Sequence, residues 1–130
     1  MKLILKKWIE YAGADLDVAQ RLFKSPRPTR WTYLLMFWHC HQVVEKMIKM
    51  VVVKKGKELL KIHDLPRLHQ LADVEFSNQE KKFIDELNKY YLKPRYPDLI
   101  YKPLPKISRA QAKDYLQKTK KLFLCLKKQA

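Results

Sequence analysis

The segment from Trp31 to Val53 constrains the fold more than any other part of this chain. Its apolar residues cover most sides of a helix, so that a helix here has to be contacted from several directions. It also carries polar and charged residues, namely His39, His41, Gln42, Glu45, Lys46 and Lys49. That many polar groups are too costly in hydrocarbon for a membrane span. The segment therefore predicts the central helix of a soluble protein with no membrane contact.

Proline, glycine and capping residues mark the helix ends. Apolar residues between Leu5 and Phe23 follow the helical period, and the sequence 25–28 (Ser-Pro-Arg-Pro) stops that helix. Thr29 is expected to cap the central helix, and Gly56 is expected to end it after Lys55.

The second half of the chain shows the same kind of signal. Asp64 is predicted to cap a short helix with help from His63, and Pro66 fits its first turn. The sequences 77–80 (Ser-Asn-Gln-Glu) and 108–111 (Ser-Arg-Ala-Gln) are capping boxes ahead of two further helices. No run alternates with period two. We therefore expect an all-α, up-and-down bundle of four long helices and one short helix, forming a single domain over residues 1–130.

The charge is strongly positive, with 28 Lys+Arg against 13 Asp+Glu and a formal net charge of +15. Such a field favours polyanions, namely RNA, DNA, nucleotides or an acidic protein partner. A lysine-rich composition is also typical of thermophiles or of a solubility strategy. Cys40 and Cys125 are far apart and form no zinc-ligand pattern, so that we expect a reduced, cytoplasmic chain. No pair of histidines has metal-ligand spacing with a carboxylate at hand, and no glycine-rich phosphate loop occurs in the sequence, so that we expect no metal and no cofactor.

The segment from Tyr90 to Asp98 places Arg95 between two prolines and several aromatic residues. Proline makes this backbone stiff and non-helical, which suits an arginine presented to a ligand. Basic residues alternate with tyrosines from 89 to 109, a composition that can hold phosphates and stack bases. The same composition also fits the rim of a protein interface, or a rigid turn whose tyrosines pack on the core.

His41, Glu45 and Lys49 form a polar stripe on the otherwise apolar central helix. Burying this stripe without partners would be costly, so that it is expected to meet Arg95, a second protomer or a ligand. A hydrogen-bonded network that fixes the helix register is the alternative.

Four segments, in order along the chain, resemble HEPN domains. They are 8–16 (Trp-Ile-Glu-Tyr-Ala-Gly-Ala-Asp-Leu), 41–46 (His-Gln-Val-Val-Glu-Lys), 63–65 (His-Asp-Leu) and 91–98, which ends in Arg-Tyr-Pro-Asp. The resemblance implies a helical bundle that usually dimerises, with the loop arginine facing a cleft between protomers. Many HEPN proteins are metal-independent ribonucleases, often toxins paired with a small nucleotidyltransferase.

The resemblance also implies a histidine after Arg95 with four to six residues between them, but those positions hold Ile100, Tyr101 and Lys102. A tyrosine is a poor general base because its ordinary pKa is near 10. Arg95 can still hold a phosphate, so that the substitution affects binding less than catalysis. We therefore expect a module that binds RNA or a nucleotide, or engages a nucleotidyltransferase.

Under the alternative of a ribonuclease toxin, the predicted catalytic residues are Arg95, Tyr101 and His41, with Asp98 as a further proton-transfer candidate. A purely structural oligomer is the third hypothesis. The predicted RNA- or nucleotide-binding residues are Arg95, Tyr96, Asp98, Lys102, Glu45, Lys46 and His63.

Overall fold

Helix α2 (Arg30–Lys54) runs through the middle of the molecule, and every other helix packs against it or against its neighbours. The computed structural model describes residues 1–91 and 106–130. The helices are α1 (Leu3–Phe23), α2, α3 (Leu65–Ala72), α4 (Asn78–Asn88) and α5 (Arg109–Lys127), and no strand occurs in these residues. The prediction of an all-α bundle is confirmed. α4, with 11 residues, is the shortest of the four helices predicted to be long.

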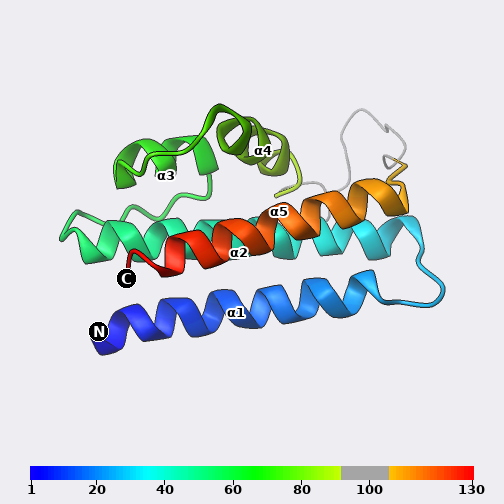
Figure 1. Ribbon diagram of the computed structural model, residues 1–130, viewed down its shortest axis with the longest axis horizontal. Coiled ribbons are helices and arrows are strands. Elements are labelled where there is room, and N and C mark those ends of the chain that lie inside the picture. The colour runs from blue at the N-terminus through cyan, green and yellow to red at the C-terminus, as the bar shows by residue number, and fades with distance from the viewer. Residues whose placement is uncertain (92–105) are drawn as a thin grey trace.

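The long helices lie side by side (Figure 1). α1 runs antiparallel to α2, and α5 runs in the same direction as α2. Two exposed hydrogen bonds join helix ends in this arrangement, one from Arg109 to the Phe23 carbonyl and one from Lys54 to the Gln129 carbonyl. α3 and α4 form a second layer on the opposite side of α2 from α1 (Figure 1). None of the helices in the described residues is both long and apolar enough to cross a membrane.

The predicted ends of α2 are confirmed. Thr29 and Thr32 form a reciprocal capping box at its start. At its end, Gly56 adopts a φ of +69°, a conformation that costs glycine nothing. The Gly56 N–H donates to the Val53 carbonyl and the Lys57 N–H donates to the Val52 carbonyl, which together make a Schellman motif.

The capping box at Ser77 is also confirmed, because Ser77 and Glu80 exchange both bonds. At the start of α5 only half of the predicted box forms. The Ser108 hydroxyl accepts from the Gln111 N–H, and no bond from the Gln111 side chain back to the Ser108 N–H occurs among the described residues.

The start of α3 corrects the sequence interpretation. Asp64 occupies the N-cap position, but its side chain makes no capping bond. The Leu65 N–H donates instead to Asn88 Oδ1 at 2.9 Å, from the last residue of α4. His63 does not cap the helix either, because its Nδ1 bonds to Glu45. The first N–H of α3 is thus satisfied by a tertiary contact.

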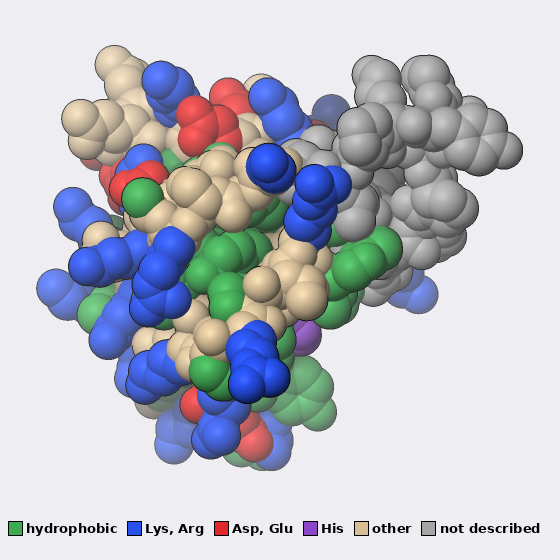
Figure 2. Space-filling model, turned by 90° about the vertical axis from the view of Figure 1, so that its right-hand side faces the viewer, with side chains coloured by type: hydrophobic (Ala, Val, Ile, Leu, Met, Phe, Trp, Pro, Cys, Tyr) green, Lys and Arg blue, Asp and Glu red, His purple; other side chains and the backbone are tan. Residues whose placement is uncertain are grey.

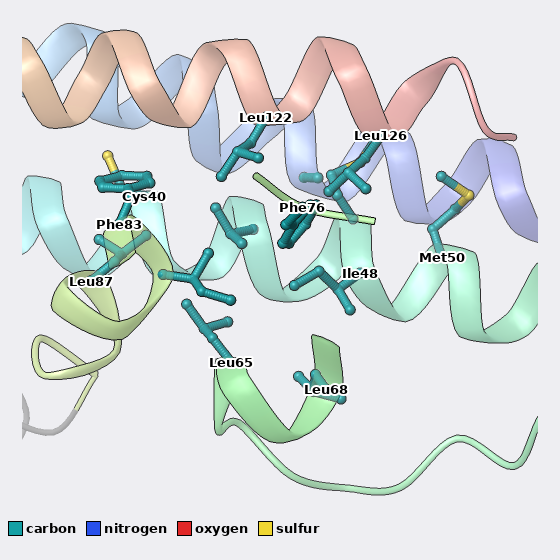
Figure 3. Close-up of a cluster of buried hydrophobic side chains, with 14 of the residues drawn as sticks. Cys40, Ile48, Met50, Leu65, Leu68, Phe76, Phe83, Leu87, Leu122 and Leu126 are labelled. Carbon is teal, nitrogen blue, oxygen red and sulfur yellow. The ribbon is translucent and has the colours of Figure 1, made fainter. Parts of the chain in front are cut away.

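The core surrounds α2, as the apolar pattern of that helix predicts. Figure 3 shows Cys40, Ile48 and Met50 of α2 with side chains that other elements contribute to the same cluster: Leu65, Leu68, Phe76, Phe83, Leu87, Leu122 and Leu126. Phe37 is fully buried, and its ring stacks on Tyr115 with centroids 4.3 Å apart. Tyr90 meets the same ring edge-on at 4.9 Å, so that this tyrosine packs on the core.

Candidate functional site

A polar cluster lies between α2, the start of α3 and the end of α4. We call it the His63 cluster, and it consists of His41, Glu45, Lys49, His63 and Asn88.

Glu45 is the centre of the cluster and is 3% exposed. One of its carboxylate oxygens accepts from Lys49 Nζ at 3.1 Å, one helical turn away on α2. His63 Nδ1 lies 3.0 Å and 3.1 Å from the two oxygens. A buried carboxylate is tolerated when it is paired and hydrogen-bonded in this way. The polar stripe predicted on the central helix therefore meets a partner, and that partner is His63.

His63 remains accessible although its ring is held in place. Its side chain is 46% exposed. The ring stacks on Tyr91, with centroids 4.6 Å apart and planes at 18°. An ionised carboxylate can only accept hydrogen bonds, so that Nδ1 carries the proton facing Glu45. In the neutral ring Nε2 is then left with its lone pair.

His41 differs from His63 because it is completely buried. Its Nε2 lies 3.3 Å from Asn88 Oδ1, and its ring centroid lies 5.1 Å from that of Tyr91. Burial lowers the pKa of His41 and outweighs the opposing effects of the Glu45 carboxylate and the Asn88 bond. The neutral, enclosed imidazole fits the alternative of a network that holds helices in register.

Asn88 was missed by sequence reasoning. Its Oδ1 accepts from the Leu65 N–H and its Nδ2 donates to Asp64 Oδ1 at 2.6 Å. One amide therefore links α4, the start of α3 and, through His41, α2. No local pattern marks an asparagine at a helix end as a tertiary link.

Lys46 was predicted to share a site with Glu45, but the structure separates the two side chains. Lys46 forms an ion pair with Asp15 of α1, and His39 Nδ1 lies 2.9 Å from the same carboxylate. Neighbouring residues on a helix point about 100° apart, so that Glu45 faces α3 while Lys46 faces α1. Burial alone would raise the pKa of Asp15, but the bonds from His39 and Lys46 outweigh it and lower that pKa.

The remaining predicted site residues, Arg95, Tyr96, Asp98, Tyr101 and Lys102, lie outside the described residues. Tyr91 is the last described residue before them and belongs to the surroundings of the His63 cluster.

The surface is rich in basic side chains, as the formal net charge of +15 leads one to expect. On the face shown in Figure 2, Lys and Arg side chains far outnumber those of Asp and Glu. Among the residues that the structure describes, no group of three or more His, Cys, Asp or Glu side chains could hold a metal ion.

The family model of the HEPN domain matches residues 5–129. The chain belongs to the HEPN family. Among solved structures, the crystal structure of TT1696 from Thermus thermophilus matches with a TM-score of 0.77 and 21% identity, and the alignment covers 97% of this chain and 98% of that chain. At this identity the match shows a shared fold. No curated protein matches the sequence.

Proposed function

We propose that this HEPN protein binds RNA or a nucleotide at the His63 cluster and the adjoining segment that contains Arg95. One observation carries the proposal. His63 is half-exposed, is oriented by Glu45, and stacks on Tyr91, which belongs to the predicted segment from Tyr90 to Asp98.

The chemistry of the described residues suits a nucleic-acid strand. His63 and Tyr91 offer stacked rings beside which a base can pack, and base–aromatic stacking tolerates any sequence. The excess of Lys and Arg supplies the attraction for phosphates. Arg95 is proposed to hold one phosphate in a bidentate contact.

Salt-dependent RNA binding tests this proposal. Fluorescence anisotropy with a labelled, mixed-sequence single-stranded RNA in chelator measures Kd between about 50 and 200 mM salt, where each neutralised phosphate contributes a slope of roughly −0.7 in log K. Arg95→Ala should weaken binding by about tenfold and lower the slope by about one phosphate contact. Arg21→Ala is the matched control, because Arg21 is an exposed arginine on α1 that pairs with Asp17. Equal affinity of the two variants would refute the role of Arg95, and absence of binding would refute the function.

We also propose that a second copy of the chain covers one face of α1 and α2. Tyr11 and Val18 of α1 are 61% and 37% exposed, and they line a groove of about 350 Å³ together with Lys46 of α2. Leu35, 38% exposed, lies on the same side of α2 as Lys46 because the two are three helical turns apart. Exposed apolar residues on neighbouring helices are typical of an oligomer interface.

Light scattering after gel filtration tests the dimer. Leu35→Lys should shift the protein towards monomer, because a lysine ammonium resists burial in an apolar interface. Leu124→Lys on α5 is the control, since Leu124 is an exposed leucine, at 48%, on a helix outside the proposed face. A wild-type protein that is monomeric at micromolar concentration would contradict the proposal.

A further inference from the structure

Three parts of the chain that are far apart in the sequence meet at one end of the bundle. α1 begins at this end, whereas α2 and α5 finish there (Figure 1). The Lys54 ammonium, from the last residue of α2, donates to the Gln129 carbonyl just beyond α5 at 2.7 Å. We call the surface formed by residues 1–7, 54–61 and 120–130 the lysine end.

The lysine end carries most of the positive charge of the protein. Its three segments contain 11 Lys, 1 Glu and no Arg, Asp or His, and every one of these lysines is exposed. Their formal net charge is therefore +10, out of +15 for the whole chain. Within the described residues, Lys7 alone among these lysines forms an ion pair. A concentration of unpaired cations of this kind attracts an anionic partner.

Exposed aliphatic side chains lie among these lysines. Leu3 and Ile4, in the first turn of α1, are 71% and 51% exposed. Leu124, in the last turn of α5, is 48% exposed. Clustered exposed apolar side chains that are bordered by polar ones mark contact with a protein or a membrane. The partner of the lysine end therefore has to be both anionic and able to receive apolar side chains.

The composition of the lysine end favours a lipid surface over RNA. Surfaces that bind RNA combine arginine guanidinium groups with aromatic rings on which bases stack. The lysine end contains no Arg, and its single aromatic residue, Phe123, packs against the core. At a bilayer, by contrast, aliphatic side chains enter the boundary between headgroups and acyl chains while lysine ammonium groups stay with anionic headgroups.

We propose that the lysine end docks on a bilayer that contains anionic lipids, with Leu3, Ile4 and Leu124 inserted into the headgroup region. The sequence predicted no membrane contact because the charged residues of α2 are too costly inside hydrocarbon. A contact at the bilayer surface avoids that cost, since each lysine ammonium remains hydrated. The inference is independent of the RNA proposal, because it uses no residue of the His63 cluster.

Sedimentation of the full-length protein with lipid vesicles tests the inference. Vesicles of phosphatidylcholine with about 30% phosphatidylserine are compared with vesicles of phosphatidylcholine alone, at roughly 100 mM salt. We expect saturable binding to the anionic vesicles and at least about tenfold weaker binding to the neutral ones. Binding should weaken as the salt concentration rises, because salt screens the attraction between lysines and headgroups.

Two variants separate the contribution of charge from that of insertion. Lys127→Gln combined with Lys128→Gln should weaken binding about 20-fold, because each lysine near an anionic surface contributes about fivefold. Lys81→Gln combined with Lys82→Gln is the matched control, since these are also adjacent exposed lysines, on α4, and it should change affinity by less than about twofold. Leu3→Gln leaves the net charge unchanged and should weaken binding about tenfold, because it removes apolar surface from the contact. All five residues are exposed, so that the variants are expected to fold, which circular dichroism checks.

Four outcomes would overturn the inference. Absence of binding to anionic vesicles would refute it, and so would an equal loss in the control variant on α4. Binding that Leu3→Gln leaves intact would show attraction by charge alone, without a docking surface. If the protein ignores vesicles while the Lys127 and Lys128 variant loses affinity for RNA in the anisotropy assay, the lysine end contacts RNA and the lipid surface is wrong. None of these outcomes decides the role of Arg95, which the Arg95→Ala variant tests separately.

Discussion

Asn88→Ala should destabilise the protein by about 2 kcal/mol. The substitution removes the acceptor for the Leu65 N–H, the donor to Asp64 and the partner of His41 Nε2. A neutral hydrogen bond contributes about 1 kcal/mol net, and loss of a helix cap costs about the same. Asn88 is only half-buried, so that water can replace some of the lost hydrogen bonds. The total loss of stability is therefore smaller than the sum of the three bonds.

Urea unfolding followed by circular dichroism measures this effect. With a slope of roughly 2 kcal/mol per molar, the midpoint should fall by about 1 M. Asn78→Ala is the control, because Asn78 is an exposed asparagine on the same helix, and its change should stay within about 0.5 kcal/mol. Asn88→Asp should be destabilised at neutral pH by repulsion from Asp64 and should recover in acid. If Asn88→Ala unfolds at the same urea concentration as Asn78→Ala, the proposed link between α3, α4 and α2 is wrong.

Three further predictions concern the fold. Gly56→Ala should lower the free energy of unfolding by about 1 kcal/mol, because the φ of Gly56 is +69°. Gly13→Ala, in the middle of α1, should raise it by a similar amount. Thermal unfolding measures both changes, and the reverse order would contradict the helix assignments. The pKa of Asp15 is lower in the folded protein than its value of 3.8 in the unfolded chain. Its carboxylate therefore stabilises the fold fully at pH values above 3.8, and this stabilisation is lost as the pH falls through the folded-state pKa. Asp15→Asn should therefore cost about 2 kcal/mol at pH 7 and progressively less in acid, and a cost independent of pH would refute the pairing. In an Ellman titration of native protein, only the exposed thiol of Cys125 should react rapidly with the reagent, because Cys40 is buried and burial raises its pKa to about 12. Two rapidly reacting thiols would show that Cys40 is accessible.

The helix ends could be predicted because their signals are local. Thr29, Gly56 and Ser77 act on backbone groups within a few residues, so that sequence alone contains the whole interaction. Asp64 occupies the N-cap position of α3, as predicted, but its side chain does not make the capping bond. The Leu65 N–H bonds instead to Asn88, which lies 23 residues beyond Leu65. Such a partner depends on how α4 packs, which no local pattern encodes.

The polar stripe on α2 was predictable from the sequence, but the partners of its residues were not. The spacing of Glu45 and Lys49 indicated a polar stripe and the need for a partner, yet the resemblance also grouped Lys46 with Glu45. Only the packing of α1 shows that Lys46 pairs with Asp15. His63 lies 18 residues from Glu45 and reaches it because the segment between α2 and α3 runs back along α2. The homodimer, the nucleotidyltransferase partner and the cytoplasmic location stay predictions.

Histidine ring resonances offer the most direct test of RNA binding at the His63 cluster. The chain has only 4 histidines, so that each ring signal can be assigned by single substitutions. In an NMR titration of the full-length protein with the single-stranded RNA, the ring signal of His63 should shift with the occupancy measured by anisotropy. The signal of His69, which is bonded to the Val74 carbonyl, should stay in place. Saturable RNA binding that leaves the His63 signal unmoved would place the binding site elsewhere and contradict the account.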